Sequence, residues 1–294
     1  MRVRDPWTRL PLRLAELCKP GLSASAAASA AAGFAAGSAR LSGELALPFA
    51  GVFLLACGAC ALNQVQDRNR DAAMERTRRR PLPTRSVPAS AALAVSLSLL
   101  AGGFLILALG GRPVLILAAI AVGWYNGVYA ALKRVTAFAA VPGAVAGSLP
   151  LAIGWVWAGG GPGQAGLWAL CGLFFVWQVP HFWLIVFDHG RDFRRAGLPS
   201  LADVFSGPQI RRLVAQWTLG TSAFALLLSI GGVVRTPPAK AALAVLSVWL
   251  GAAAVRFASG RARTGDILFR QMNFFILAVI ALICLDGLGA VGPG

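Results

Sequence analysis

The sequence predicts an all-α, polytopic membrane protein with about nine transmembrane helices and a cytoplasmic N-terminus. Its composition is 57% hydrophobic and only 13% charged, whereas soluble domains contain about 25% charged residues. Long apolar segments recur along the chain, and most basic residues fall in alternate connections between them. Together these three observations exclude a soluble globular domain.

The first segments of the chain differ from those that follow. Residues 1–20 alternate basic residues with Trp7 and several leucines, which is typical of an amphipathic segment lying on the membrane surface. Residues 21–38 are rich in alanine, serine and glycine. Because small residues allow helices to approach closely, this first span is expected inside the helix bundle.

The remaining spans are apolar over about the 20 residues that a helix needs to cross the hydrocarbon core. Two long polar connections, residues 64–86 and 188–212, interrupt them. Residues 1–294 are interpreted as one membrane domain. The expected further spans are 45–63, 87–109, 113–131, 137–158, 165–187, 213–233, 239–258 and 267–289.

The distribution of charge predicts the topology. The chain has 27 Lys and Arg against 11 Asp and Glu, a formal charge of +16, and the nine-span arrangement places 23 of the 27 basic residues on one side. The positive-inside rule puts that side, with the N-terminus and both polar connections, in the cytoplasm. No basic stripe interleaved with aromatic residues points to nucleic acid. The absence of an Arg/Ser-rich presequence favours a bacterial cytoplasmic (inner) membrane.

The first polar connection contains a candidate metal site. If the second span continues as a helix, Asn63, Asp67 and Asp71 share one face because they are four residues apart. Two neighbouring carboxylates repel each other, and a divalent cation relieves this repulsion. All-oxygen ligands favour Mg²⁺, which shares its coordination shell with phosphate oxygens.

Arginines follow the acidic face directly. Arg76 and Arg80 belong to a run of four arginines within residues 76–80, and guanidinium groups match the geometry of phosphate. The pattern therefore indicates a Mg²⁺-diphosphate site at the membrane face. An arginine-rich connection is more often a topology anchor, so the carboxylate spacing is what favours the site.

The second polar connection repeats the acidic spacing. Asp188 and Asp192 are again four residues apart, at the cytoplasmic end of the sixth span. The two acidic pairs are expected to face each other across a central cavity. There they would hold a pair of metal ions around one diphosphate.

Polar side chains also occur inside or beside other spans. Gln178 and His181 lie at membrane depth, where an unpartnered polar group is costly. His181 has three interpretations: a ligand of heme iron, a group that orients a substrate, and a hydrogen-bond partner of a neighbouring helix. Tyr129 and Lys133, four residues apart and followed by Arg134, indicate either a phosphate contact or interfacial anchoring.

These segments resemble the UbiA-type superfamily of intramembrane prenyltransferases, and within it the heme-farnesylating branch of protoheme IX farnesyltransferases (heme O synthases). The acidic blocks mark the superfamily, whereas Trp-Gln-x-Pro-His and the Met-x-Arg-Thr ending are typical of the heme branch. The last three spans match only as generic spans. The blocks are Lys19-Pro20, Asn63 through Pro81, Tyr129 through Arg134, and Trp177 through Pro199.

The resemblance implies nine helices around a cavity open to the bilayer, with Mg²⁺ as cofactor, farnesyl diphosphate and heme b as substrates, and heme O for terminal oxidases as product. It also implies heme A synthase or an oxidase assembly protein as a partner. The implied metal ligands are Asn63, Asp67, Asp71 and Asp192, and the acidic spacing of the second connection adds Asp188. The implied catalytic residues are Asp67, Asp71, Asp192 and Lys133. The implied substrate contacts are Asn63, Arg76, Arg80, Lys133 and His181, and the polar residues Tyr129, Arg134 and Gln178 of the same blocks are further candidates.

Two other functions are compatible with the same residues. One is a UbiA-type prenyltransferase that acts on a quinone precursor or a chlorin. The other is a non-enzymatic transporter with the acidic pairs as ion sites. Transporters usually place charge near the bilayer midplane, and the carboxylates here are expected at helix ends, which disfavours the transporter.

Overall fold

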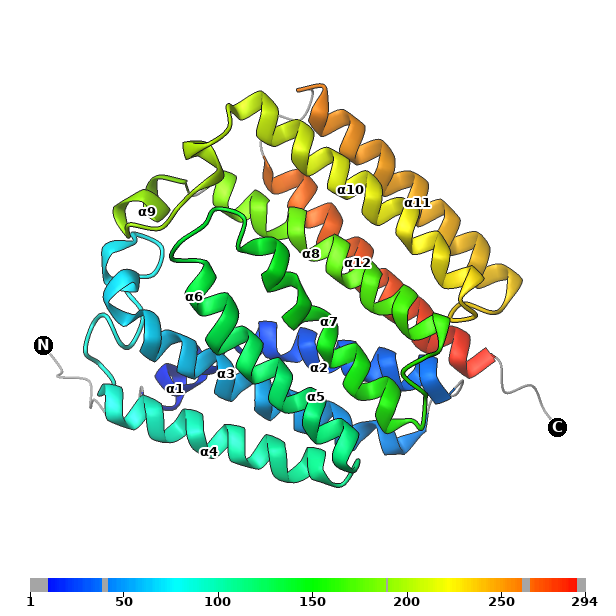
Figure 1. Cartoon of the computed structure of the whole chain (residues 1–294), viewed down its shortest axis with the longest axis horizontal. Helices are drawn as coiled ribbons and strands as arrows, with labels where there is room; N and C mark the ends of the chain where they lie inside the picture. The colour runs from blue at the N-terminus through cyan, green and yellow to red at the C-terminus, as the bar shows by residue number, and fades with distance from the viewer. Residues whose placement is uncertain (1–9, 39–41, 189, 261–264, 290–294) are drawn as a thin grey trace, which may run out of the picture.

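The structure is a computed structural model that describes residues 10–38, 42–188, 190–260 and 265–289. Within these ranges the regular elements are helices, and they pack side by side as one bundle (Figure 1). Trp7 and three of the five basic residues expected on the membrane surface precede residue 10 and lie outside the described residues. The described part of that surface segment is the helix α1 (Leu10–Cys18).

Eight helices in the described ranges are long and apolar enough to cross a membrane. The helix α2 (Pro20–Ser38), which corresponds to the expected first span, brings the number of long helices in these ranges to nine. The predicted class, an all-α integral membrane protein, is confirmed. The eight are α3 (Ala46–Ala73), α4 (Ala89–Ala108), α5 (Arg112–Gly123) with its continuation through η3 (Trp124–Tyr129) and α6 (Ala130–Leu132), α7 (Ala140–Trp157), α8 (Ala165–Asp188), α10 (Gly207–Ile230), α11 (Pro237–Ala258) and α12 (Gly265–Gly289).

Helix α2 lies inside the bundle, as its small residues predict. About half of its residues are buried, and it packs against α3, α7 and α12. A Cβ atom added at Gly33 would lie 2.1 Å from the carbonyl oxygen of Leu151, and one at Gly154 would lie 1.8 Å from that of Ala30. The two glycines therefore allow α2 and α7 to touch through their backbones.

Two helix boundaries differ from the expected ones. Helix α3 continues to Ala73, beyond the predicted end of the span at residue 63, because its polar residues still present one buried face to the protein. Helix α10 begins at Gly207 rather than at residue 213, after Ser206, whose backbone N–H donates to Gln209 Oε1 at 2.8 Å. The predicted polar connections are therefore partly helical, and the second also contains α9 (Gly190–Arg195) and η4 (Leu201–Asp203).

At the end of the bundle opposite the polar connections, one buried carboxylate joins several segments by hydrogen bonds. Asp286 of α12 is 4% exposed and accepts hydrogen bonds from the backbone N–H groups of Arg235 at 2.7 Å and Thr236 at 3.1 Å. Arg235 in turn donates to the carbonyl oxygen of Ala36 at 3.0 Å. These bonds hold the segment directly before α11 against α12 and α2.

Candidate active site

The acidic residues of the first connection line the buried face of α3, as their spacing predicts. Asn63, Asp67 and Asp71 are 8%, 8% and 3% exposed. The side-chain nitrogen of Asn63 and one carboxylate oxygen of Asp67, Oδ1, are buried without a hydrogen-bond partner. Buried polar atoms are rarely left in this state, so this face has unused capacity to bind a ligand.

Basic groups from two other segments converge on the same face. Lys133 hydrogen-bonds to Asp67 Oδ2, and the Arg134 guanidinium lies 3.5 Å from Asp67 Oδ1 as an ion pair. Arg80 Nη1 lies 2.8 Å from Asp71 Oδ2. Each buried carboxylate therefore has a cationic partner, as the burial of charge requires.

The turn after α3 positions Arg80. Thr77 is fully buried and donates from its hydroxyl to the carbonyl oxygen of Asp71 at 2.9 Å. The backbone N–H groups of Thr77 and Arg78 both donate to the carbonyl oxygen of Met74. The Met-x-Arg-Thr sequence thus ends α3 and folds the chain back, which brings Arg80 to Asp71.

The two polar connections meet. The backbone N–H of Arg76 donates to Asp192 Oδ2 at 3.1 Å, and the Arg195 guanidinium lies 3.6 Å from the Glu75 carboxylate. Asp192 is thereby brought to the loop that follows the first acidic pair. The side chain of Asp188, at the end of α8, and the whole of His189 lie outside the described residues.

The electrostatics of Arg76 reflect this convergence. Partial burial, and then the nearby Arg80, lower the pKa of the Arg76 guanidinium. Asp71 and Asp192 act in the opposite direction. Arg76 therefore lies within the field of both connections, which is where a polyanionic ligand would be stabilised.

Lys19 is a further member of this charge cluster. Sequence reasoning did not assign Lys19 to the site. It lies between α1 and α2 with φ 45°, a backbone conformation that non-glycine residues rarely adopt. Burial lowers the pKa of its ammonium group, and Arg80, Asp71 and Lys133 also act on it. Lys19 therefore belongs to the same charge cluster. The available signal was its position directly before Pro20 at the start of the first span.

The segment η3 is π-helical and brings Tyr129 and Lys133 to α3. Its buried residue Asn126 donates to the carbonyl oxygen of Ala59 at 2.9 Å and accepts at its backbone oxygen from Gln66 at 2.9 Å. Short π-helical segments occur often at functional sites. Lys133 Nζ lies 5.5 Å from the centre of the Tyr129 ring, so the two side chains lie on one face of this segment.

Aromatic rings lead from this cluster towards His181. The Tyr129 ring lies 6.0 Å from that of Phe182, which lies 5.9 Å from the imidazole of His181. The imidazole also packs on Trp177 at 4.9 Å and on Phe269 at 4.6 Å. His181 Nδ1 is buried without a hydrogen-bond partner.

Helices α7 and α12 complete the surroundings of His181 and Gln178. The Asn273 side chain lies next to the His181 imidazole, and Gln178 Oε1 is buried without a partner. A Cβ atom at Gly147 would lie 2.0 Å from Gln178 Oε1. Sequence reasoning missed Asn273 and Gly147, because a single Asn or Gly in an apolar span does not indicate what it faces.

The comparison with known families decides the class of protein. A family model described as UbiA prenyltransferase family matches residues 24–279, a range that includes the acidic face of α3, Lys133 and His181. The chain belongs to the UbiA prenyltransferase family. The superfamily expected from the four sequence blocks is thereby confirmed.

Two curated relatives of this UbiA family member carry the same name. The protoheme IX farnesyltransferase of Geobacter sulfurreducens is 49% identical over 155 residues, which cover 53% of this chain and 57% of the relative. The protoheme IX farnesyltransferase of Oleidesulfovibrio alaskensis is 32% identical over 256 residues, which cover 85% of this chain and 87% of the relative. The first match therefore spans little more than half of its relative, and the second spans most of it.

Solved structures confirm the UbiA fold. A digeranylgeranylglyceryl phosphate synthase superimposes with a TM-score of 0.76 at 16% identity, over 95% of this chain and 99% of that one. A UbiA homolog from Archaeoglobus fulgidus bound to GPP and Mg²⁺ superimposes with a TM-score of 0.67 at 14% identity, over 93% and 99%. At these identities the likeness shows the fold alone.

The oxygen atoms of the UbiA family member's acidic face fit a magnesium ion that is shared with a substrate. Among the described residues, no three His, Cys, Asp or Glu side chains lie close enough to hold a metal by themselves. Mg²⁺ commonly takes one or two protein carboxylates and completes its shell with water and phosphate oxygens. Asp67, Asp71 and the amide oxygen of Asn63, next to Arg80 and Lys133, match that arrangement better than a closed protein cage.

Proposed function

We propose that this UbiA family member transfers a farnesyl group from farnesyl diphosphate to heme b and so forms heme O. The observation that carries the proposal is the buried cluster in which Lys133 and Arg80 meet Asp67 and Asp71. The name shared by the Geobacter and Oleidesulfovibrio relatives supports the choice of both substrates.

The polar cluster would bind the diphosphate. Asn63, Asp67 and Asp71, with Asp192 and Asp188 from the second connection, would hold Mg²⁺. When bound, Mg²⁺ supplies positive charge to the departing diphosphate. The Archaeoglobus homolog bound to GPP and Mg²⁺ supports the use of this ion.

The basic residues would promote cleavage of the allylic C–O bond. Arg76, Arg80 and Lys133 stand beside the carboxylates and would donate to the diphosphate oxygens, with Arg134 at the edge of the cluster. Such donors stabilise the charge that grows on a leaving group in a site shielded from water. The bond would then ionise towards a farnesyl cation.

The aromatic path would carry the reaction to the acceptor. Tyr129 and Phe182 offer the allylic cation an apolar, π-rich surface that excludes water. Gln178 and His181, with their unpartnered buried atoms, would orient heme b beyond them. A vinyl group of the heme would attack the farnesyl cation, which leaves a carbocation on the vinyl carbon next to the porphyrin ring. Water would add to that carbon and lose one proton, which gives the hydroxyethylfarnesyl side chain, with diphosphate as the leaving group.

The proposed setting is the bacterial cytoplasmic membrane. The curated relatives are bacterial, and the positive-inside rule places the polar cluster at the cytoplasmic face. Heme A synthase or an oxidase assembly protein is the proposed partner, because heme O serves terminal oxidases.

Expression in bacterial cells that lack heme O tests the function. Chromatography of extracted hemes is expected to show heme O with the parent chain and none with Asp67→Ala or Asp71→Ala. Asp266→Asn is the control, because Asp266 is an exposed carboxylate in the first turn of α12, outside both polar connections. Heme O from either aspartate variant, or none from the parent chain present in the membrane, contradicts the proposal. Release of diphosphate from farnesyl diphosphate by purified protein, abolished by EDTA and restored by Mg²⁺, tests the cofactor.

A further inference from the structure

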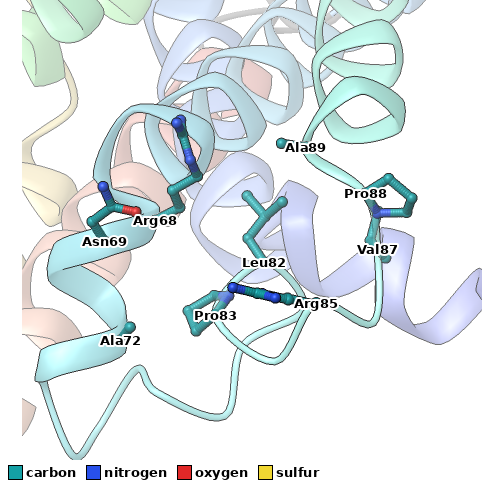
Figure 2. Close-up of a pocket in the computed structure, with 9 residues that line it drawn as sticks. All are labelled: Arg68, Asn69, Ala72, Leu82, Pro83, Arg85, Val87, Pro88 and Ala89. Atoms are coloured by element: carbon teal, nitrogen blue, oxygen red, sulfur yellow. The ribbon is translucent and has the colours of Figure 1, made fainter.

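A groove of about 550 Å³ lies on the outer side of the first polar connection (Figure 2). It is bordered by Arg68 and Ala72 at the end of α3, by the connection that contains Arg85, and by Ala89, the first residue of α4. Arg68 and Ala72 are exposed, whereas the neighbouring Asp67 and Asp71 are buried. The groove is therefore separate from the active-site cluster and lies on another face of the same helix.

The groove carries positive charge without a compensating carboxylate. Arg68 and Arg85 both border it, and no acidic residue does (Figure 2). In the described ranges neither arginine forms an ion pair; Arg68 donates only to the carbonyl oxygen of Val65 at 3.0 Å. Arg13 of α1 donates to the carbonyl oxygen of the adjacent Ser86 at 3.3 Å. An anion therefore complements this surface.

The connection projects Arg85 in a defined conformation. Arg85 has φ 54°, in the left-handed region that favours glycine. Its backbone N–H donates to the carbonyl oxygen of Leu82 at 3.0 Å, and the N–H of Ser86 donates to that of Pro81 at 2.9 Å. Leu82 and Val87 are buried in a small apolar core beneath the connection. The guanidinium of Arg85 is thus carried by a turn anchored on the protein.

The groove continues into a lipid-facing stripe. Ala89, Leu93 and Leu97 are four residues apart and share one face of α4. Leu93 and Leu97 are 38% and 54% exposed, and Leu105 further along the helix is 73% exposed. Exposed leucines on a membrane-spanning helix face acyl chains. A molecule with an anionic head and apolar chains would therefore match both parts.

We propose that this groove binds an anionic phospholipid, with the phosphate between Arg68 and Arg85 and the acyl chains along Ala89, Leu93 and Leu97. Guanidinium groups match phosphate oxygens in charge and geometry. The apolar stripe favours a lipid over free phosphate. The proposed lipid site does not depend on the proposed reaction. It shares with the active site only the first polar connection, which contains Arg80 and borders the groove.

Native mass spectrometry of the purified full-length protein tests this site. Phosphatidylglycerol, phosphatidylcholine and inorganic phosphate are titrated separately. The groove variant is Arg68→Gln with Arg85→Gln. The control variant is Arg212→Gln with Arg256→Gln, which removes the same charge from exposed arginines of α10 and α11. We expect phosphatidylglycerol to bind the groove variant about 25-fold more weakly than the parent, at about fivefold per arginine, and the control variant like the parent.

Three results would overturn the proposal. An equal loss of phosphatidylglycerol affinity in the groove variant and the control variant would show that the lipid is attracted by surface charge in general. Equal binding of phosphatidylcholine would show that the negative headgroup is not selected, and displacement of phosphatidylglycerol by inorganic phosphate at comparable concentration would show a free-anion site. Arg68→Lys with Arg85→Lys, which keeps the charge, is expected to retain most of the binding. Loss of binding in this lysine variant with an unchanged melting temperature would also contradict the site.

Discussion

The backbone N–H of Arg76 donates to the carboxylate of Asp192 across 3.1 Å, although the two residues are 116 positions apart. This bond joins the two acidic connections of the UbiA fold at one point. Because the donor is a backbone group, a change of the Arg76 side chain leaves the link in place. A change of Asp192 removes it.

The two residues are therefore expected to give different kinetic defects. Asp192→Ala should lower diphosphate release from farnesyl diphosphate by at least about 100-fold, because it removes both a proposed metal ligand and the hydrogen bond from Arg76 that helps to join the connections. Arg76→Ala should mainly raise KM for farnesyl diphosphate, because the connections stay joined and only a phosphate contact is lost. Steady-state kinetics of the two purified variants measure the difference. Near-parental kcat/KM for Asp192→Ala would rule out its role.

Lys19 makes stability depend on pH. Burial lowers the pKa of its ammonium group in the folded chain from the ordinary value of 10.5, so the unfolded chain binds this proton more tightly. The free energy of unfolding should consequently rise with pH between the lowered pKa and 10.5. Below the lowered pKa, the folded chain still carries the full cost of burying the charged ammonium group. Lys19→Met removes the titrating group. Its melting temperature at pH 7 should equal or exceed that of the parent, with the difference shrinking towards pH 10. A variant that melts lower at pH 7 would contradict this.

Gly147 is expected to control the acceptor end of the site. In Gly147→Ala the new methyl group would stand 2.0 Å from Gln178 Oε1, so the Gln178 side chain must turn away. We expect heme O formation to fall about tenfold, the size of one lost polar contact, with release of diphosphate unchanged. Gly220→Ala is the control, because its methyl group would meet Val176 at an ordinary 3.6 Å. Equal losses of both activities in Gly147→Ala would point to a general folding defect instead.

The contact between α2 and α7 is expected to limit stability. Gly33→Ala places a methyl group 2.1 Å from the carbonyl oxygen of Leu151, and backbone atoms cannot yield as a side chain can. A loss of about 3 kcal/mol is expected, at the upper end of the usual cost of overpacking. Thermal melting in detergent should show the loss, whereas Gly251→Ala, with its nearest contact at 3.7 Å, should melt like the parent.

Asp286 is expected to hold the far end of the bundle together. Asp286→Ala leaves the backbone N–H groups of Arg235 and Thr236 without their acceptor and should cost about 2 kcal/mol. Glu44→Ala removes an exposed acidic residue from the same end and should cost little. Diphosphate release at low temperature should survive in both variants, because the polar cluster lies at the opposite end. Selective loss of activity without a change in melting would refute a purely structural role.

The sequence by itself determined the membrane class, the approximate spans and the first acidic face. Apolar length and charge distribution are properties of single segments. The rise and twist of a helix are local as well, so the spacing of Asn63, Asp67 and Asp71 was enough to place them together. The small residues of 21–38 likewise predicted an interior helix, because close approach depends on side-chain size.

Only the tertiary structure decided which distant groups meet these residues. Three such meetings are the contact of Arg76 with Asp192, the position of Lys19 beside the acidic face, and the position of Asn273 next to His181. Each joins segments that no periodicity relates. The end of α3 at Ala73 also depended on burial of its polar face, which hydropathy alone does not show. Helical geometry follows from neighbouring residues along the chain, whereas the pairing of charges across a bundle follows from how whole helices pack.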